Sequence, residues 1–324
     1  MMPQVVIAGA GPAGLAAAAA TADAGASTLV LDEQRAAGGR LRYQVQPVAA
    51  APSVPAERPS DLLERLRAEA VAAGAVVQTG TVVSACFAGL ELLVVEGDAA
   101  SRLAPDALIV TTGSTDLPFP FSGATLPGVF SARATQILLN EHRVRPGRRF
   151  AIVGSDEAAE ALTVDILLAG GEVVWSGVAP APFLRAEGDN GVSALVVGQD
   201  RFDVDVVVIA VGRQADAALA TMAGVPLGFV AALGGLVPLV DERMRSSVSG
   251  LFMAGDAAGP GSVAAAIAEG RLAGVAAAAE LGLATEDEVR QALIAAGPEV
   301  AARAAMRADL APLHQQPYEP ADAR

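Results

Sequence analysis

Three glycines near the start of the chain have the spacing of a dinucleotide-binding turn. Gly9, Gly11 and Gly14 lie in VVIAGAGPAG, where a β-branched apolar run enters a glycine loop and leaves it into an alanine-rich stretch. In such a turn the first glycine allows a tight bend, the second lets a diphosphate approach the backbone, and the third lets the helix pack on its strand. The helix N-terminus then faces the phosphates. This pattern predicts binding of a dinucleotide.

Two carboxylates follow the next predicted strand, which covers 27–31. They belong to Asp32 and Glu33, and Gly25 closes the helix before that strand. An acidic side chain at this strand end accepts hydrogen bonds from ribose hydroxyls. The sequence leaves open which of the two carboxylates does so.

A further acidic residue ends a short apolar strand late in the chain. Asp256 completes the segment LFMAGD and is followed by Gly259, Gly261, Ser262 and a predicted helix. A carboxylate in this position can hydrogen-bond a sugar-alcohol chain, while the helix N-terminus faces an electron-rich ring.

The elements that must position these residues are predicted from hydrophobic patterning. A proline-rich connector at 47–59 leads into a helix over 60–74, with Ser60 as its N-cap. Later strands are expected at 76–83, 90–95 and 107–112, and a helix at 131–140.

At Phe150 the order of strand, glycine turn, helix and strand begins again, which predicts a second nucleotide-fold unit. This unit is degraded. Only Gly154 keeps its place, and Asp156 and Glu157 stand where small residues would admit a diphosphate, so their charges would repel phosphate. Its second strand ends in Trp175, Ser176 and Gly177, with no acid for a ribose. A fold kept without its ligand is favoured over NAD(P) binding.

Composition narrows the class of protein. The chain has 324 residues, a net charge of −14 and 52% hydrophobic residues, which predicts a large core and no nucleic-acid surface. Its single cysteine, Cys86, excludes an intrachain disulfide, a CxxC pair and an iron–sulfur cluster held by this chain's thiolates. Cys86 is expected to be inert core, and no metal site is predicted.

Other titratable residues are given structural roles. His142 and His314 have no catalytic neighbour pattern and are expected at the surface. Glu160 and Asp165, inside the helix of the second unit, are expected to be solvated. No catalytic residue is identified from the sequence.

Targeting signals are not evident. No basic residue occurs before Arg35, and Gly, Pro and Asp23 break the apolar N-terminal stretch, so a cytoplasmic protein is expected rather than a secreted one. No apolar run is long enough to predict a transmembrane segment.

In this order the motifs resemble the two-dinucleotide-binding-domain flavoproteins, over residues 4–282. The resemblance implies an α/β architecture like that of thioredoxin reductase and glutathione reductase, with FAD as cofactor. It implies an FAD-binding Rossmann-like domain at 1–144 and 240–284, an inserted smaller NAD(P)-binding-like domain at 145–239, and a helical tail at 285–324.

The resemblance also implies roles for individual residues. The FAD diphosphate would lie on Gly9, Gly11, Pro12, Ala13 and Gly14, and the adenosine ribose on Asp32 or Glu33. Asp256 would bind the ribityl chain, Val83 would contact adenine through its backbone, and the N–H groups of Ser262 and Val263 would face the flavin pyrimidine edge. The remaining expected cofactor contacts are Gly39, Arg40, Thr112, Gly113 and Gly255.

The segments 32–42 and 117–139 look most like those of one subgroup, the FAD subunit of heteromeric amine and imino-acid dehydrogenases of the opine oxidase, hydrogen cyanide synthase and dye-linked (hydroxy)proline dehydrogenase type. That resemblance implies that the partner is a second flavoprotein subunit, and that the substrate is a small amine or imino acid. The usual glutamine after the paired glycines is Arg40 here, and the cysteine-rich segment is missing, so any iron–sulfur relay would lie on a partner. A guanidinium from Arg40 or Arg42 near the flavin would favour a reduced anionic ring or hold a substrate carboxylate; a surface position for both is the alternative.

Three hypotheses follow. The first is the electron-transfer subunit of such a dehydrogenase, favoured by 117–139. The second is a stand-alone NAD(P)H-dependent flavin reductase without a redox disulfide, disfavoured by the damaged turn at 154–159. The third is a non-catalytic flavin-binding assembly subunit.

Overall fold

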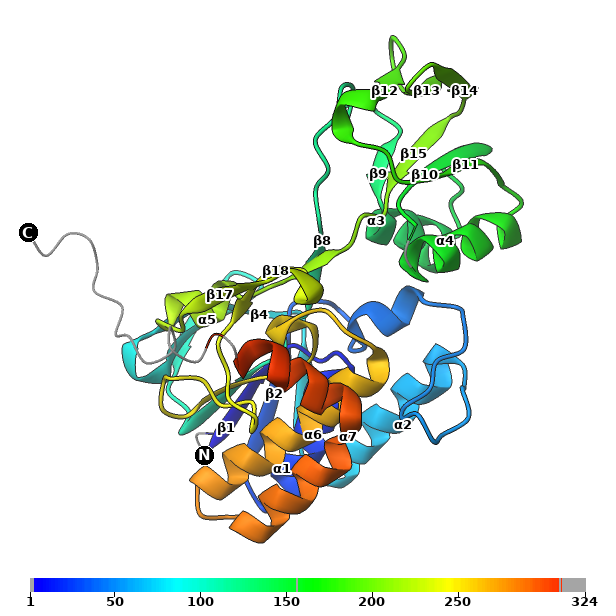
Figure 1. The fold of residues 1–324 in the computed structure, drawn as a ribbon. Coiled ribbons are helices and arrows are strands. Elements are labelled where there is room, and N and C mark those ends of the chain that lie inside the picture. The colour runs from blue at the N-terminus through cyan, green and yellow to red at the C-terminus, as the bar shows by residue number, and fades with distance from the viewer. Residues whose placement is uncertain (1–2, 156, 309, 311–324) are drawn as a thin grey trace, which may run out of the picture. The chain divides into compact units, whose positions relative to one another are not determined.

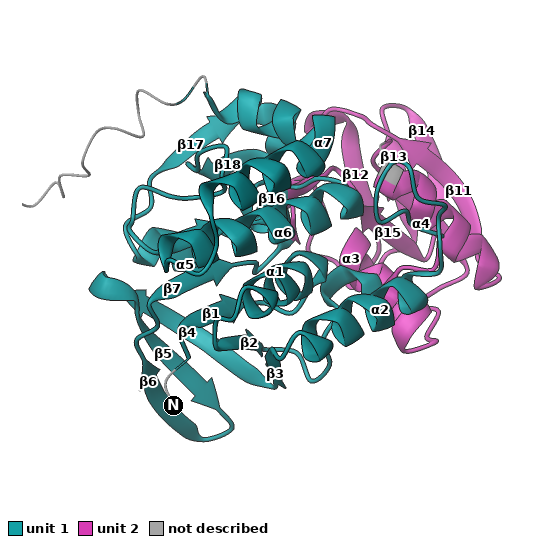
Figure 2. Cartoon of the chain, turned by 90° about the horizontal axis from the view of Figure 1, so that it is seen from below, with its two compact units in different colours: residues 1–41, 47–114, 214–324 teal, residues 42–46, 115–213 magenta. Residues whose placement is uncertain are grey.

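The computed structural model describes residues 3–155, 157–308 and 310. The chain forms two compact units, shown in different colours in Figure 2. Unit 1 comprises residues 1–41, 47–114 and 214–324, and unit 2 comprises residues 42–46 and 115–213.

Unit 1 is built on a five-stranded parallel sheet with the order β19-β7-β1-β2-β3. Every residue of β1 and β7 is buried, as expected for central parallel strands covered on both faces. This sheet brings together strands from both ends of the chain. Its strands are β1 (Val5–Ala8), β2 (Thr28–Asp32), β3 (Val76–Thr79), β7 (Ala107–Val110) and β19 (Leu251–Met253).

Three long helices of unit 1 pack side by side, namely α1 (Pro12–Asp23), α6 (Val263–Glu280) and α7 (Glu286–Ala308) (Figure 1). Glycines allow α1 and α6 to approach closely: a Cβ on Gly270 would lie 2.2 Å from the carbonyl oxygen of Ala13. A fourth helix, α2 (Pro59–Ala72), packs against α1. Its N-cap is Arg58 rather than Ser60, because Pro59 fits the first helical position.

Smaller elements complete unit 1. The strands β4 (Thr81–Phe87), β5 (Glu91–Glu96) and β6 (Ala99–Leu103) form an antiparallel sheet, and β17 (Leu227–Val230) pairs with β18 (Gly235–Pro238) after the short helix α5 (Ala218–Met222). The strand expected over 76–83 is two strands, since Gly80 turns the chain with φ +71°. Where the chain passes from one unit to the other, β8 (Ser114–Asp116) pairs with β16 (Arg213–Ala215).

Unit 2 has its own parallel sheet, in the order β11-β10-β15-β9. These strands are β9 (Val129–Ser131), β10 (Arg149–Val153), β11 (Glu172–Gly177) and β15 (Val206–Ile209). The helices are α3 (Ala132–Gln136), which continues as a π-helical turn (Ile137–Glu141), and α4 (Glu157–Leu168). An antiparallel sheet of β12 (Leu184–Glu187), β13 (Ala194–Val197) and β14 (Asp200–Asp203) completes the unit.

The α/β fold with two parallel-sheet units is confirmed. The bounds of the two units differ from those of the expected domains, which were an FAD-binding domain at 1–144 and 240–284 and an inserted domain at 145–239. Segment 115–144 lies in unit 2, because β9 pairs with β15, and 214–239 lies in unit 1. Within the described residues, no helix has both the length and the apolar character to cross a membrane.

Candidate functional site

Two glycines of the β1–α1 turn are required by packing alone. Gly9 has φ +110°, and a Cβ there would lie 2.4 Å from the carbonyl oxygen of Thr111. A Cβ on Gly14 would lie 1.9 Å from the carbonyl oxygen of Gly9. A side chain at Gly9 would therefore displace the turn from Thr111, and one at Gly14 would displace α1 from the turn.

Gly11 is different, because its surroundings are open. Its φ is −75°, and the nearest atom that a Cβ would meet is Cα of Gly39 at 3.9 Å. No side chain caps α1, and its first turn holds no acidic residue. The first-turn N–H groups have no intrahelical acceptor, so this end of α1 fits an anionic diphosphate.

The two candidate ribose acids have different environments. Asp32 is 7% exposed, and its carboxylate accepts hydrogen bonds from the N–H groups of Ala10, at 2.6 Å, and Gln34, at 2.8 Å. Glu33 is exposed, and its carboxylate accepts a bond from the Gln34 side chain at 3.2 Å. Asp32 is thus held beside the glycine turn, while Glu33 lies at the surface.

The paired glycines pack against the same turn. The N–H of Gly38 donates to the carbonyl oxygen of Ala10 at 2.8 Å, and Gly39 begins a 3₁₀ turn, Gly39–Tyr43, that contains Arg40. Arg42, considered with Arg40 for a flavin role, belongs to unit 2 and forms an ion pair with Glu141.

The segment after β7 is hydrogen-bonded to the glycine turn between β1 and α1. The Thr111 hydroxyl donates to the carbonyl oxygens of Ala8, at 3.0 Å, and Gly9, at 2.8 Å. Thr112 and Gly113, the predicted contacts, follow; the Thr112 hydroxyl bonds the carbonyl oxygen of Asp216 at 2.7 Å. Thr111 is a supporting residue that the sequence did not single out, although it directly precedes the predicted contacts Thr112 and Gly113.

Val83 lies on β4, partly buried against the main core of unit 1. The N–H of Gly80 donates to the carbonyl oxygen of Gln34 at 2.8 Å, which brings the start of β4 to the acid-bearing end of β2. Val83 follows three residues later.

Asp256 lies in a turn that is held from several sides. One carboxylate oxygen accepts a bond from the Ser114 hydroxyl at 2.7 Å, and the other accepts one from the N–H of Gly261 at 3.1 Å. Ser262 is the N-cap of α6, and its hydroxyl oxygen accepts from the N–H of Ala265 at 3.0 Å. Val263 is the first residue of the helix.

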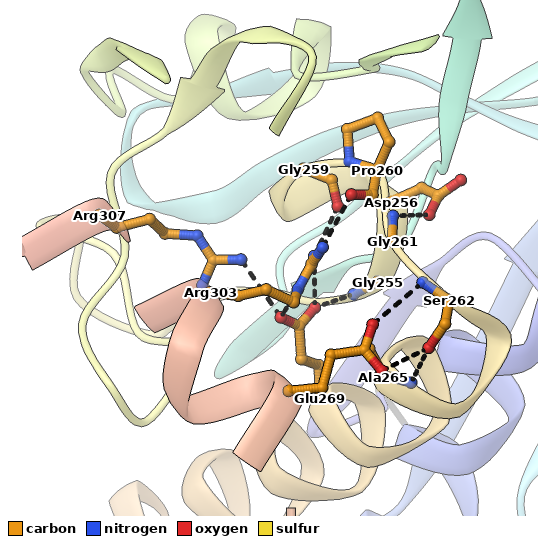
Figure 3. A network of polar contacts seen from close by, with 11 residues as sticks. Gly255, Asp256, Gly259, Pro260, Gly261, Ser262, Ala265, Glu269, Arg303 and Arg307 are labelled. Atoms are coloured by element: carbon orange, nitrogen blue, oxygen red, sulfur yellow. Dashed lines mark hydrogen bonds and ion pairs between the residues drawn. The ribbon is translucent and has the colours of Figure 1, made fainter. Parts of the chain in front are cut away.

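A buried ionic cluster behind this turn was not predicted. Glu269 of α6 is fully buried, and Arg303 and Arg307 of α7 both bond its carboxylate (Figure 3). One Glu269 oxygen also accepts from the N–H of Gly255 at 3.0 Å. Burial lowers the pKa of Arg307. The only sequence signal is the four-residue spacing of the two arginines, which by itself is typical of an ordinary charged helix face.

In unit 2, close backbone packing explains why a glycine occupies position 154. Gly154 has φ +155°, and a Cβ there would lie 2.0 Å from the carbonyl oxygen of Ala210. Asp156, expected to repel phosphate, lies outside the described residues, and so does the Glu157 side chain.

Asp165 is buried, so the expectation of a solvated charge was wrong for it. It is 1% exposed, and its carboxylate accepts bonds from the side chains of Gln46, at 2.6 Å, and Gln136, at 3.1 Å. Burial raises the pKa of its carboxyl group, although these amide bonds partly oppose the shift. The helix turns this face toward α3, whereas Glu160 is exposed as expected.

The remaining candidates are ordinary in their surroundings. His142 is exposed, Cys86 is buried and the pKa of its thiol is raised by burial, and His314 lies outside the described residues. Among the described residues, no group of three or more His, Cys, Asp or Glu side chains could hold a metal ion. A cavity of about 910 Å³ lies beside α1, α6 and α7. None of the expected cofactor-binding residues lines this cavity.

Comparison with known proteins gives a family match and several relatives. A family model described as pyridine nucleotide-disulphide oxidoreductase matches residues 3–163 and 180–270. The chain is 27% identical to an opine oxidase subunit of Rhizobium meliloti, covering 86% of this chain and 71% of that protein. It is also 27% identical to the alpha subunit of sarcosine oxidase of Corynebacterium sp., covering 89% of this chain but 34% of that protein.

Solved structures support the fold. L-proline dehydrogenase from P. horikoshii superposes with a TM-score of 0.77 at 23% identity, covering 90% of this chain and 59% of that one. Thioredoxin reductase from T. acidophilum gives a TM-score of 0.66 at 20% identity, covering 86% of this chain and 98% of that one.

Proposed function

This chain belongs to the pyridine nucleotide-disulphide oxidoreductase family, and from that premise we propose that it is the FAD-bearing electron-transfer subunit of a heteromeric amine or imino-acid dehydrogenase. One observation carries the cofactor part. The glycine turn, Asp32 and the Asp256 turn lie at the carboxyl ends of β1, β2 and β19, strands of one parallel sheet. Ligands of open α/β sheets bind at that edge.

In this proposal different residues bind different parts of FAD. The α1 N-terminus and Gly11 take the diphosphate, Asp32 rather than Glu33 takes the ribose, and Asp256 takes the ribityl chain. The α6 N-terminus favours negative charge at the flavin ring. Bound FAD supplies the two-electron chemistry that side chains lack. The other proposed contacts are Gly9, Pro12, Ala13, Gly14, Gly39, Arg40, Val83, Thr112, Gly113, Gly255, Ser262 and Val263.

The substrate and partner parts rest on the relatives, two of which are named as subunits of opine oxidase and sarcosine oxidase. We identify no acid–base residue for amine oxidation in the described part of unit 1. The proposal therefore assigns substrate oxidation to a second flavoprotein subunit. It assigns any iron–sulfur relay to a partner as well.

A stand-alone NAD(P)H-dependent flavin reductase is the second candidate. It is favoured by the fold likeness to thioredoxin reductase and by the second parallel sheet in unit 2. The acidic residues Asp156 and Glu157 stand in the sequence where small residues would admit a diphosphate, and their charges argue against it.

Two measurements separate these functions. Tagged protein from its native cells is examined for bound flavin and co-purifying subunits, and the purified chain is then titrated anaerobically with NADH and NADPH while the flavin absorbance is followed. The dehydrogenase proposal expects bound FAD, a second flavoprotein subunit, and no rapid bleaching by either nucleotide. Rapid bleaching by NADH or NADPH, or full amine turnover by the chain alone, would overturn it.

A further inference from the structure

The turn that carries Asp256 is held from behind by one side chain of helix α7. The Arg303 guanidinium donates to the carbonyl oxygen of Pro260 at 2.8 Å and to that of Gly259 at 2.5 Å. Its Nε donates to Glu269 at 2.7 Å. Arg303 therefore joins the turn to helices α6 and α7.

The cluster excludes water, which makes these contacts strong. Glu269 is fully buried and Arg303 is 4% exposed. Hydrogen bonds to a charged group are stronger than neutral ones, and they strengthen further away from water. Two turn carbonyls that would otherwise need backbone or solvent partners are bonded by this one guanidinium.

The backbone of the turn lies directly against this guanidinium. A Cβ on Gly261 would lie 2.3 Å from Nη1 of Arg303, so the backbone is in close contact with the arginine. The N–H of the same Gly261 donates to Asp256. At the other end of the turn, the N–H of Gly255 donates to Glu269. Gly255 is thus hydrogen-bonded to Glu269, and Gly261 lies against Arg303.

An interruption in helix α7 precedes the segment that carries Arg303. Gly297, with φ +80°, interrupts the helix before Pro298, so a new helical segment begins there. Glu299 and Arg303 are four residues apart on that segment. The Glu299 carboxylate accepts bonds from the Ser262 hydroxyl at 2.7 Å and the Ser262 N–H at 3.3 Å.

We propose that Arg303 is a positioning residue for the cofactor: paired with Glu269, it holds the 255–262 turn in the conformation in which Asp256 and the α6 N-terminus bind FAD. This inference rests on the proposed function for the identity of the ligand. The control of the turn's conformation by Arg303 does not depend on the ligand.

Arg307 is the matched control within the same cluster. It lies one turn further along α7, is 3% exposed, and bonds Glu269 through Nη2 at 3.2 Å. Its Nε and Nη1 have no hydrogen-bond partner among the described residues, and in Figure 3 the side chain points toward Glu269. Arg290, exposed on α7 and paired with Asp287, controls for loss of charge on the helix.

The test compares Arg303→Met, Arg303→Lys, Arg307→Met and Arg290→Met in the full chain. FAD is removed and re-added, and its dissociation constant is measured by flavin fluorescence. Hydrogen exchange of residues 255–262 is measured on the FAD-free chain. Circular dichroism establishes that each variant is folded.

Arg303→Met is expected to weaken FAD binding about tenfold or more, since bonds to a charged group are lost, and to speed exchange of the turn amides. Arg303→Lys is expected to restore part of both. Arg307→Met and Arg290→Met are expected to match the wild type. If Arg303→Met does not fold, Glu269→Gln, which keeps the side-chain shape, is expected to give the same two effects.

Two results would overturn the inference. One is unchanged exchange of the turn in a folded Arg303→Met chain. The other is an equal loss of FAD affinity in Arg303→Met and Arg307→Met. Failure of the wild-type chain to bind FAD would instead defeat the proposed function, and the exchange measurement would still decide the role of Arg303 in the turn.

Discussion

The backbone N–H of Ala10 donates a hydrogen bond of 2.6 Å to Oδ2 of Asp32, so the acidic residue that ends β2 is bonded to the middle of the glycine turn. Glu33, the next residue, is exposed. This difference separates two carboxylates that the sequence presents as equivalent.

Asp32→Ala is expected to weaken FAD binding at least about tenfold and to lower the free energy of unfolding by about 1–3 kcal/mol, because it leaves the buried N–H of Ala10 without a partner. Glu33→Ala is expected to stay within about 0.5 kcal/mol of the wild type. Urea unfolding of the FAD-free chain and flavin titration check both. A larger loss of affinity in Glu33→Ala would assign the ribose to Glu33.

Gly11→Ala is expected to leave the FAD-free chain as stable as the wild type, because the added Cβ meets only Cα of Gly39 at 3.9 Å. It is expected to bind FAD weakly, since the methyl group stands where the diphosphate must approach. Thermal unfolding with and without added FAD measures both effects. Equal stabilisation by FAD in variant and wild type would contradict the assignment of the diphosphate to this turn.

Gly14→Ala, unlike Gly11→Ala, is expected to destabilise the FAD-free chain. Its Cβ would lie 1.9 Å from the carbonyl oxygen of Gly9, so the turn must shift even without a ligand. We expect a loss of about 1–3 kcal/mol in the FAD-free chain, measured by urea unfolding. A fully stable Gly14→Ala chain would show that α1 can move away from β1 freely.

The two buried arginines of α7 are expected to differ in how much stability the chain loses when each is replaced by methionine. Arg307 has two nitrogens without partners among the described residues, so Arg307→Met removes a buried charge and leaves Glu269 paired with Arg303; its stability is expected to be unchanged within about 1 kcal/mol, or raised. Arg303→Met is expected to cost about 3 kcal/mol, because it breaks a buried ion pair. Urea unfolding of both variants checks this order.

Asp165 predicts a pH-dependent stability with a definite sign. Burial raises the pKa of its carboxyl group above 3.8, so ionisation is harder in the folded chain than in the unfolded one. The resulting destabilisation is absent below about pH 3.8, grows as the pH rises toward the folded-state pKa, and is constant above it.

Asp165→Asn is therefore expected to melt at a higher temperature than the wild type at pH 7, with the difference shrinking on acidification toward about pH 4. Glu160→Gln, on the exposed face of the same helix, is the control and is expected to change little. A difference in melting temperature that stays constant over this pH range would contradict this account.

The sequence by itself determined the features that local geometry requires. Gly9 and Gly14 were recognisable because only glycine fits a positive φ and a close carbonyl contact, and the spacing from strand to turn to helix is a short-range property. The acidic residue at the end of β2, the Asp256 turn and the repeated unit at Phe150 were recognisable because each is also a short-range sequence pattern. Periodicity within about 30 residues indicated each βαβ unit.

Tertiary structure alone decided what depends on distant contacts. Thr111, which follows β7, hydrogen-bonds Gly9 from 102 residues away in the sequence, and Arg303 bonds Glu269 from 34 residues away. Asp165 is buried because α4 turns it toward Gln136, and segment 115–144 joined unit 2 because β9 pairs with β15. Helical spacing shows which residues share a face, but burial of that face, and the partner of a buried charge, are set by packing between elements that no local pattern encodes.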